Sequence, residues 1–377
     1  MATTINADTS NGLVITPDTS GDINLQSAGV TKASITSAGL TVGGSNISPQ
    51  PTFRNRIING NMTIDQRFAG AASTPANNIY TLDRWNAGLS QGSKYSVQQV
   101  VDAPDGLYNS VKMTVLATAT LGATDYFMLK QKIEGYNVAD FNFGTSQVST
   151  ITVSFWVKST VTGTFGGSVQ NSSEARGYAF NYAISSANTW EKKSVTLTGD
   201  TTGTWDKTTG TGLWLNLALG VGTTYSKTVG SWVAGPVLSA TGATNLLATG
   251  SATIQFTGVQ LEAGTTATDF ENLQYGQQLA LCQRYYEQNY GTNNYEIKIQ
   301  GLTSGLTNSA FRVSKRADAT TTVYSSVTQV AGTVNNGNGN VQTAISSVIS
   351  GKESFWVVMA GTSSQVYTYY FKSSSEL

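Results

Sequence analysis

Apolar and polar residues alternate along most of this chain, in short runs that fit the two-residue period of a β-strand. Eight such runs follow one another in the middle of the chain, and stretches rich in Gly, Ser and Asn connect them. They cover residues 95–101, 109–117, 127–133, 150–158, 176–184, 191–197, 213–220 and 252–261. Short strands at this spacing are typical of an antiparallel β-sandwich. We therefore predict one jelly-roll domain over residues 52–270.

The last part of the chain, residues 289–377, shows the same alternation. Its candidate strands lie at residues 295–300, 310–314, 321–327, 341–349, 354–360 and 365–372. The Asn-Gly run at residues 335–340 is predicted to be a loop, because Asn and Gly tolerate positive φ. We expect a second, sandwich-like β unit that forms the tip of the protein.

One stretch between these two parts has the period of a helix. Tyr275, Leu279, Cys282 and Tyr286 are spaced four, three and four residues apart, which places them on one helical face. This predicts a helix over residues 276–287, inside a junction at 271–288. The face is expected to pack against the sandwich or against another copy of the chain. A plain surface helix on a sheet is the alternative.

Residues 1–50 contain apolar runs that are too short to form a core of their own. The runs lie at residues 13–15, 22–25, 32–35 and 40–42, and Gly separates them. We expect strands that intertwine between copies of the chain, with a disordered leader as the alternative. Pro49-Gln50-Pro51 predicts a stiff boundary after them. The patterns together predict an all-β protein with an intertwined N-terminal segment, a jelly-roll sandwich, a short helical junction and a β-rich tip.

Composition excludes several classes of function. Charged residues make up only 12% of the 377 residues and the formal net charge is zero, whereas a nucleic-acid binder needs a basic surface. The chain has no His, which excludes His general bases, Ser-His triads and His-ligated metals. The single Cys282 permits no intrachain disulfide and is expected in a core. We expect no cofactor and no metal.

Targeting signals are also missing from the sequence. No apolar run approaches the ~20 residues that a spanning helix needs, and the first residues are polar. We therefore expect synthesis in a cytoplasm without a signal peptide, and no membrane insertion.

The charged motifs are better explained by structure than by chemistry. Asp65-Gln66-Arg67 and Asp83-Arg84-Trp85 predict an ion pair that holds the start of the domain on the sandwich. Glu262 or Asp269 offers oxygen ligands for calcium, but a hydrogen-bonded turn is the preferred interpretation. No spacing selects two carboxylates for glycoside hydrolysis, so we expect no catalysis.

Aromatic residues give the best indication of a binding function. The chain has 17 Tyr, 13 Phe and 7 Trp, and the C-terminal unit is rich in them. Sugar rings present apolar C–H faces that stack on such side chains. Tyr367 and Tyr369 share one strand face, although the sequence does not say which face is core. We select these two for glycan binding, with Tyr324 and Tyr295 as neighbours and Trp356, which a core position also suits, as a further candidate.

Two motifs resemble the signatures of bacteriophage tail-fibre and tail-appendage proteins. The first is NRIINGNM at residues 55–62, which is followed by DQR and by YTLDRW at 80–85. The second is GVQLEAG at 258–264, which is followed by LALCQRYY at 279–286. Between them, SFWVKS and LWLNLALG resemble strands of the jelly rolls in carbohydrate-binding modules.

The resemblance implies a structural subunit of a virion tail fibre, which we expect to be a homotrimer. Residues 1–50 would attach it to other phage tail proteins. Residues 289–377 would adhere to a host surface polysaccharide or lipopolysaccharide. Two alternatives remain open: a purely structural appendage, such as a head fibre or collar component, and a glycan-degrading tailspike.

Overall fold

The structure, a computed structural model, describes residues 23–36, 39–42, 45–46, 53–289, 297–302, 306–336, 341–359 and 363–377. The predicted strand at residues 13–15, the proline boundary at 49–51 and Tyr295 lie outside the described residues. The chain divides into two compact units, Met1–Arg54 and Asn55–Leu377. The second unit contains the predicted sandwich, junction and tip together.

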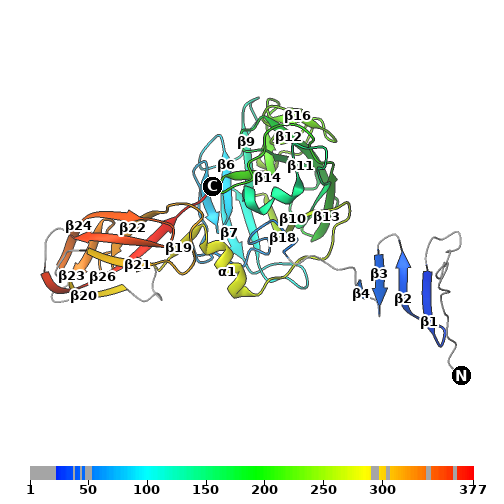
Figure 1. Cartoon of the computed structure of the whole chain (residues 1–377). Helices are drawn as coiled ribbons and strands as arrows, with labels where there is room; N and C mark the ends of the chain where they lie inside the picture. Colours follow the sequence, from blue (N-terminus) through cyan, green and yellow to red (C-terminus); the bar gives the residue numbers. More distant parts are fainter. Residues whose placement is uncertain are drawn as a thin grey trace, which may run out of the picture. The chain divides into compact units, whose positions relative to one another are not determined.

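The first unit contains a small antiparallel sheet (Figure 1). Its strands are β1 (Ile23–Ser27), β2 (Val30–Thr36), β3 (Gly39–Val42) and β4 (Ser45–Asn46). Ala28 and Gly29 both have positive φ, as a tight hairpin turn between β1 and β2 requires. None of the side chains described in this sheet is buried, and Leu25, Val30 and Ile35 are 53%, 56% and 46% exposed. The strands therefore form as expected, but no core forms among the described residues of this unit.

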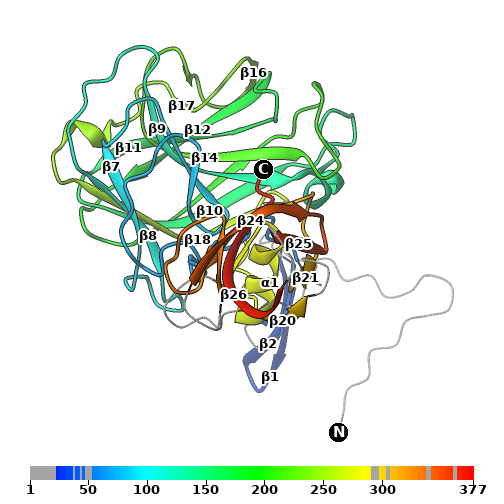
Figure 2. The same cartoon turned by 90° about the vertical axis from the view of Figure 1, so that its left-hand side faces the viewer.

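The second unit begins with a sandwich of two antiparallel sheets (Figures 1 and 2). The five-stranded sheet has the order β13 (Glu191–Leu197), β10 (Ile151–Ser159), β18 (Thr253–Ala263), β8 (Ser110–Val115), β7 (Tyr95–Val100). The seven-stranded sheet has the order β16 (Trp232–Ala234), β12 (Arg176–Ile184), β11 (Gly163–Gln170), β14 (Thr211–Val221), β9 (Tyr126–Glu134), β6 (Trp85–Leu89), β5 (Ile79–Leu82). All eight predicted strands are present. The sequence did not predict β5, β6, β11, β16 or the short parallel pair β15 (Ser226–Lys227) and β17 (Ser239–Ala240).

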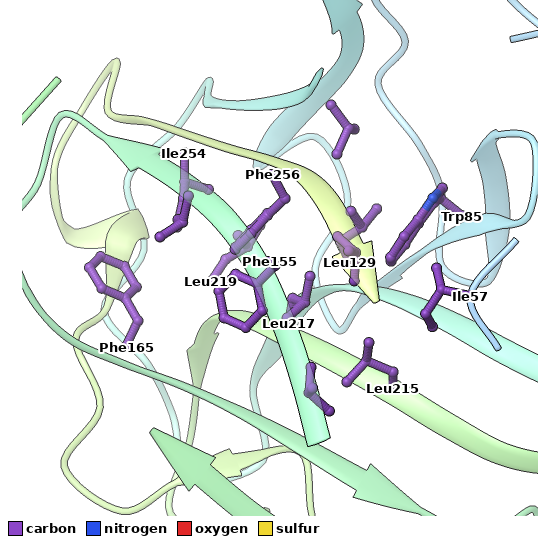
Figure 3. Close-up of a cluster of buried hydrophobic side chains, with 14 of the residues drawn as sticks. Ile57, Trp85, Leu129, Phe155, Phe165, Leu215, Leu217, Leu219, Ile254 and Phe256 are labelled. Carbon is purple, nitrogen blue, oxygen red and sulfur yellow. The ribbon is translucent and has the colours of Figure 1, made fainter. Parts of the chain in front are cut away.

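The core of the sandwich follows directly from the alternation along its strands. Every second residue of β14 is fully buried: Leu213, Leu215, Leu217 and Leu219. Phe155 from β10 and Phe256 from β18 fill the space from the other sheet, with ring centres 5.8 Å apart (Figure 3). Burying one Leu or Phe stabilises the fold by about 1.5–3 kcal/mol. The residues between the leucines, including Trp214 and Asn216, consequently face the outer side of the seven-stranded sheet.

The two motifs that resemble phage signatures contact each other. The Asn55 side chain accepts a hydrogen bond from the Leu261 amide (3.1 Å) and donates one to the Val259 carbonyl (3.1 Å). The Gly60 carbonyl accepts from the Val259 amide at 2.9 Å, and a Cβ at Gly60 would lie 2.1 Å from the Val259 oxygen. Only glycine permits this approach. The motifs therefore have an architectural role, because one fixes the start of the domain on the strand formed by the other.

The junction contains α1 (Tyr275–Gln283), the one α-helix among the described residues, followed by β19 (Tyr286–Gln288). The helix ends four residues earlier than predicted, because Tyr286 pairs with Ser374 in a sheet of the tip. Cys282 is fully buried in a small cluster with Ile58. Leu279 packs against that cluster and is partly buried.

Tyr275 was expected to share this packing face. It is 65% exposed and lies outside the cluster, so that expectation is wrong. It is the first residue of α1. None of the described helices is long and apolar enough to cross a membrane.

The tip is a second β unit organised around one long strand. Its elements are β20 (Ile297–Leu302), β21 (Leu306–Ala310), β22 (Thr320–Ser325), β23 (Thr333–Asn336), β24 (Val341–Ser350), β25 (Ser354–Met359) and β26 (Ser363–Ser374). β26 pairs with β19, β20, β22 and β23. Two predictions need correction: the strand expected at 310–314 ends at Ala310, and Asn335 and Asn336 belong to β23 rather than to a loop.

The charged motifs DQR and DRW do meet, and their ion pairs run to the C-terminal part of the chain. Gln66 donates to both Asp83 carboxylate oxygens, from its amide (2.7 Å) and from its side chain (2.6 Å). Arg67 pairs with Glu376 at 2.8 Å, and the buried Arg84 pairs with the same carboxylate. The arginines thus attach the end of β26 to the sandwich. We call Arg67, Arg84 and Glu376 the C-terminal clamp.

Candidate functional site

A pocket of about 230 Å³ lies on the outer face of the seven-stranded sheet. It is lined by Asn78, Tyr126, Met128, Lys130, Lys132, Glu174, Trp214, Tyr225 and Leu238. The floor comes from β9, where Met128, Lys130 and Lys132 alternate with residues that face the core. Segment 222–248 forms one wall, because the Leu238 amide binds the Tyr225 carbonyl (2.9 Å) and Ser168 of β11 binds the Val237 carbonyl (2.6 Å).

Trp214 is the central side chain of the pocket. It lies on β14 directly opposite Lys132 of β9. The ammonium nitrogens of Lys130 and Lys132 each lie 4.9 Å from the centre of the Trp214 ring, within the range of cation–π attraction. The indole N–H is buried and has no hydrogen-bond acceptor among the described residues. This N–H therefore lacks the acceptor that a buried donor usually has.

Lys130 is only 6% exposed. Its ammonium donates to the Asn78 side-chain oxygen at 2.7 Å, which is a neutral partner. Burial and, to a smaller extent, the charge of Lys132 lower the pKa of Lys130 to about 8, against the opposing charge of Glu174. Lys132 donates to the main-chain oxygen of Leu377 at 2.9 Å, and burial lowers its pKa as well.

Glu174 is the carboxylate of the pocket lining, and its charge raises the pKa of Lys130 and Lys132 against the effect of burial. The pocket therefore holds two ammonium groups against one indole, with one carboxylate in its lining.

Two tyrosines complete the aromatic part of the pocket. The rings of Tyr126 and Tyr225 meet edge to face with centres 6.0 Å apart. The Tyr126 hydroxyl accepts a hydrogen bond from Asn77 at 3.2 Å, which fixes the ring at the pocket mouth. Aromatic faces beside a few donors and acceptors are the usual lining of a small-ligand site. This combination suits a sugar ring, whose C–H faces are apolar and whose hydroxyls need polar partners.

Tyr367 and Tyr369, the first candidates from the sequence, lie elsewhere and are buried. They are 7% and 0% exposed, and they pack with Phe355 in the core of the tip. The Tyr369 hydroxyl is bonded to Ser309 at 2.7 Å. A ring inside a core cannot stack on a sugar, so these two residues are corrected to core residues. The two tyrosines do share one face of β26, as the alternation predicted, and the structure shows that this face is core.

Trp356 is the candidate that remains on the surface of the tip. It is 42% exposed on β25, between Ile349 (59% exposed) and Asn308 of the neighbouring strands. Tyr324 is half-buried, and the Lys372 ammonium lies 5.3 Å from its ring. Trp356 and Ile349 therefore form a second surface, on which an aromatic ring is accessible.

The proposed calcium ligands are part of a hydrogen-bonded turn. Glu262 is buried and accepts from the Thr268 amide (2.9 Å), the Thr268 hydroxyl (2.7 Å) and Gln260 (2.8 Å). Asp269 points into solvent. No cluster of three potential ligands from His, Cys, Asp or Glu occurs in the described part of the chain. Burial raises the pKa of Cys282 well above its usual value, which keeps the thiol unreactive.

The sequence did not lead us to select Lys130, Lys132 or Trp214 as site residues, although the alternation along their strands gave an indication. In LWLNLALG the leucines occupy every second position, so a core made by them forces Trp214 to the outer face. The same argument places Lys130 and Lys132 on the outer face of the run at 127–133. That β9 and β14 are neighbours could not be known without the topology.

No family model matches this chain, and no curated protein matches it. Several solved structures are similar over about half of it. One is the enzymatically active domain of tailspike protein 4 from bacteriophage CBA120, at 12% identity and a TM-score of 0.30, with 56% of this chain and 22% of that chain covered. Another, described by the words "CBM4 structure and function", has 14% identity and a TM-score of 0.28 over 55% of this chain and 98% of that one.

A third is TmCBM61 in complex with β-1,4-galactotriose, at 12% identity and a TM-score of 0.28, covering 56% of this chain and 99% of that one. At these identities and TM-scores, the likenesses assign neither a ligand nor an activity to this chain.

Proposed function

We propose that this protein binds a glycan in the pocket on the seven-stranded sheet. The observation that supports this most strongly is Trp214, a partly exposed indole with a free N–H and two ammonium groups beside it. A sugar ring would lie against the indole, and its hydroxyls would bind the indole N–H, Asn78 and Glu174.

The size of the pocket supports a short stretch of glycan as the ligand. Its volume of about 230 Å³ is below the ~300–1,000 Å³ of pockets for drug-sized ligands. One sugar residue fits such a space, while its neighbours in the polymer extend along the outer face of the sheet. A small contact gives weak affinity per site, because the ligand loses rotational freedom on binding.

We further propose that the chain is a subunit of a virion appendage, such as a tail fibre. The resemblance of residues 55–62 and 258–286 to phage signatures supports this. The exposed apolar residues of β1 and β2 support a homotrimer that forms through residues 1–54 and docks there on other tail proteins. Several weak sites on one oligomer then give firm attachment to a host polysaccharide or lipopolysaccharide. The protein binds without turnover, because nothing in the pocket lining pairs two carboxylates.

The tip offers a second candidate for the same function. Trp356 is accessible there and stands beside Ile349, so a glycan could stack on that surface instead. The pocket is favoured because it brings aromatic faces and several polar groups together in one lined cavity.

A glycan array with the full chain tests the proposal. Trp214→Ala should abolish binding, and Trp356→Ala should leave it unchanged. Trp190→Ala is the matched control, because Trp190 also has a lysine above its ring (Lys158, 5.0 Å), but its N–H is already bonded to Asp102 (3.2 Å). Loss of binding in Trp356→Ala alone would transfer the site to the tip. Binding to no glycan by the folded full chain would favour a purely structural appendage, and a falling viscosity of a bound polysaccharide would indicate a glycan-degrading spike.

A further inference from the structure

The charges of the pocket carry information about the ligand that its shape does not. Lys130 and Lys132 stand two residues apart on one face of β9, and their ammonium groups lie at the same distance, 4.9 Å, from one indole. Side chains at this spacing on a strand lie about 7 Å apart at the backbone. Two flexible lysines can therefore direct both ammonium groups to one small group in the pocket.

We infer that the pocket takes an acidic sugar, whose carboxylate lies between the ammonium groups of Lys130 and Lys132 while its ring lies against Trp214. The inference rests on the proposed function and names the class of ligand that this site selects.

The charge balance of the empty pocket supports an anion. Lys130 and Lys315 are the two lysines buried in the described part of the chain. Lys315 has a carboxylate partner, since its ammonium lies 2.6 Å from Glu287. The hydrogen bond of Lys130 goes instead to the neutral oxygen of Asn78, and Glu174 acts on its charge without a hydrogen bond to it among the described residues. A buried cation without a counter-ion costs free energy, and a bound carboxylate would remove part of that cost.

The surroundings of Lys132 add to the positive potential. Arg84 and Arg316 lie close enough to lower the pKa of Lys132, while Glu174 and Glu376 act in the opposite direction. Glu376 is already bonded to Arg67 and Arg84 in the C-terminal clamp. Glu376 is therefore engaged by the arginines, and Glu174 is the carboxylate that shares the pocket with the two lysines.

Titration of Lys130 gives the inference a pH signature. The groups that face it are Lys132 on the same strand, Glu174 on the β11–β12 turn, the neutral Asn78 before β5, and Trp214 on β14. Its pKa of about 8 means that the ammonium form dominates at pH 7 and is lost above pH 8. Affinity for an acidic sugar should fall between pH 7 and pH 9.5, and affinity for a neutral sugar should not.

The test is a binding measurement with matched acidic and neutral ligands. The full chain is screened on an array of uronic-acid, sialic-acid, phosphorylated and neutral glycans. Each bound acidic glycan is then reduced at its carboxyl group, which keeps the ring and removes the charge. Calorimetry with both forms should show a loss of about ten- to hundred-fold in affinity on reduction, the range for hydrogen bonds to charged groups.

Variants separate this inference from the proposed function. Lys130→Gln and Lys132→Gln should each weaken binding of the native glycan much more than binding of the reduced glycan. Lys158→Gln is the control, because it removes an ammonium near Trp190 that Asp102 already neutralises. Trp214→Ala should abolish binding of both forms, with Trp214→Phe as the milder variant if the alanine variant fails to fold.

Three outcomes would overturn the inference. If every bound glycan is neutral, or if reduction leaves the affinity unchanged, the acidic ligand is wrong and the proposed function stands. If binding depends on phosphate groups, and inorganic phosphate competes while galacturonate does not, the anion is a phosphate and the carboxylate is wrong. If the folded full chain binds no glycan, the proposed function fails and the inference fails with it.

Discussion

Arg84 is 1% exposed, and its guanidinium lies 3.6 Å from the ring centre of Tyr285 while it pairs with Glu376. Its Nη2 also donates to the Lys132 carbonyl at 2.5 Å. The residue that neutralises it lies almost 300 positions away in the sequence. The sequence predicted an ion pair at DRW, but nothing in the local pattern could identify Glu376 as the partner.

Glu376→Gln should destabilise the second unit by about 3–5 kcal/mol, because it leaves the buried Arg84 without its counter-ion. Denaturant unfolding of the two proteins at pH 7 measures the difference. Asp269→Asn is the control, since the Asp269 side chain is fully exposed and its pair with Lys192 is long (3.8 Å). Equal unfolding midpoints for Glu376→Gln and the native chain would contradict a stabilising role of the C-terminal clamp.

Asp83 predicts a pH dependence of stability. Burial raises its pKa from 3.8 to about 7 in the folded protein, against the opposing charge of Arg67. The folded state therefore holds a proton that the unfolded state releases near pH 4. The resulting stability is complete below pH 4 and is lost as the pH rises through 7, by at most about 4 kcal/mol.

Urea unfolding between pH 4 and pH 8 tests this dependence. Asp83→Asn should flatten the fall in unfolding free energy over that range, because the amide does not titrate. A variant whose stability falls as steeply as that of the native chain would show that other groups, such as the half-buried Asp65, cause the dependence.

At the scale of elements, the alternation of apolar and polar residues predicted where most strands lie, but it did not predict which other segments contact them. β12 and β13 have the predicted bounds, because each carries a continuous two-residue pattern. The sequence did not predict β11, because GTFGGSVQ contains few apolar residues. Its glycines instead allow another segment to approach the strand closely. A Cβ at Gly166 would lie 2.2 Å from the Ser239 hydroxyl of the segment that covers the sheet. Such contacts between distant segments leave no local periodicity.

The helix also shows that local periodicity does not report contacts between distant segments. The spacing of apolar residues such as Leu279 and Cys282 predicted the helix, but the pairing of β19 with β26 determines where the helix ends. Tertiary pairing here overrides a helical pattern that continues to Tyr286.

Leu279→Ala should cost about 1–2 kcal/mol in unfolding free energy, less than a fully buried leucine, because Leu279 only partly covers the cluster around Cys282. Tyr275→Ala on the same helix should change it by less than ~0.5 kcal/mol, as expected for an exposed side chain. The reverse order of the two effects in thermal or denaturant unfolding would show that the packing face is assigned incorrectly.

At the scale of the whole molecule, the two units differ in the hydrophobic core that their described residues form. The second unit encloses a large core, whereas Leu25, Val30 and Ile35 of the first are all about half exposed. The all-β class and the order of sandwich, junction and β-rich tip were predictable, because each depends on patterns within one segment. The pocket was not, because it arises where β9, β14 and segment 222–248 meet.

We predict that the full chain is an oligomer, most simply a trimer, that is held together by residues 1–54. Closed symmetry allows short identical strands to share a core that a single copy lacks. Sedimentation at micromolar concentration should give an oligomer for the full chain and a monomer for residues 55–377. A monomeric full chain would contradict the prediction.

The central claim is that the outer face of the sandwich, and not the tip, holds the glycan. The most direct measurement is a crystal structure of the full chain with a glycan that it binds on the array. The account predicts a sugar residue against the Trp214 ring, with Lys130 and Lys132 within hydrogen-bond distance of it. A sugar stacked on Trp356, with the pocket at Trp214 empty, would contradict it.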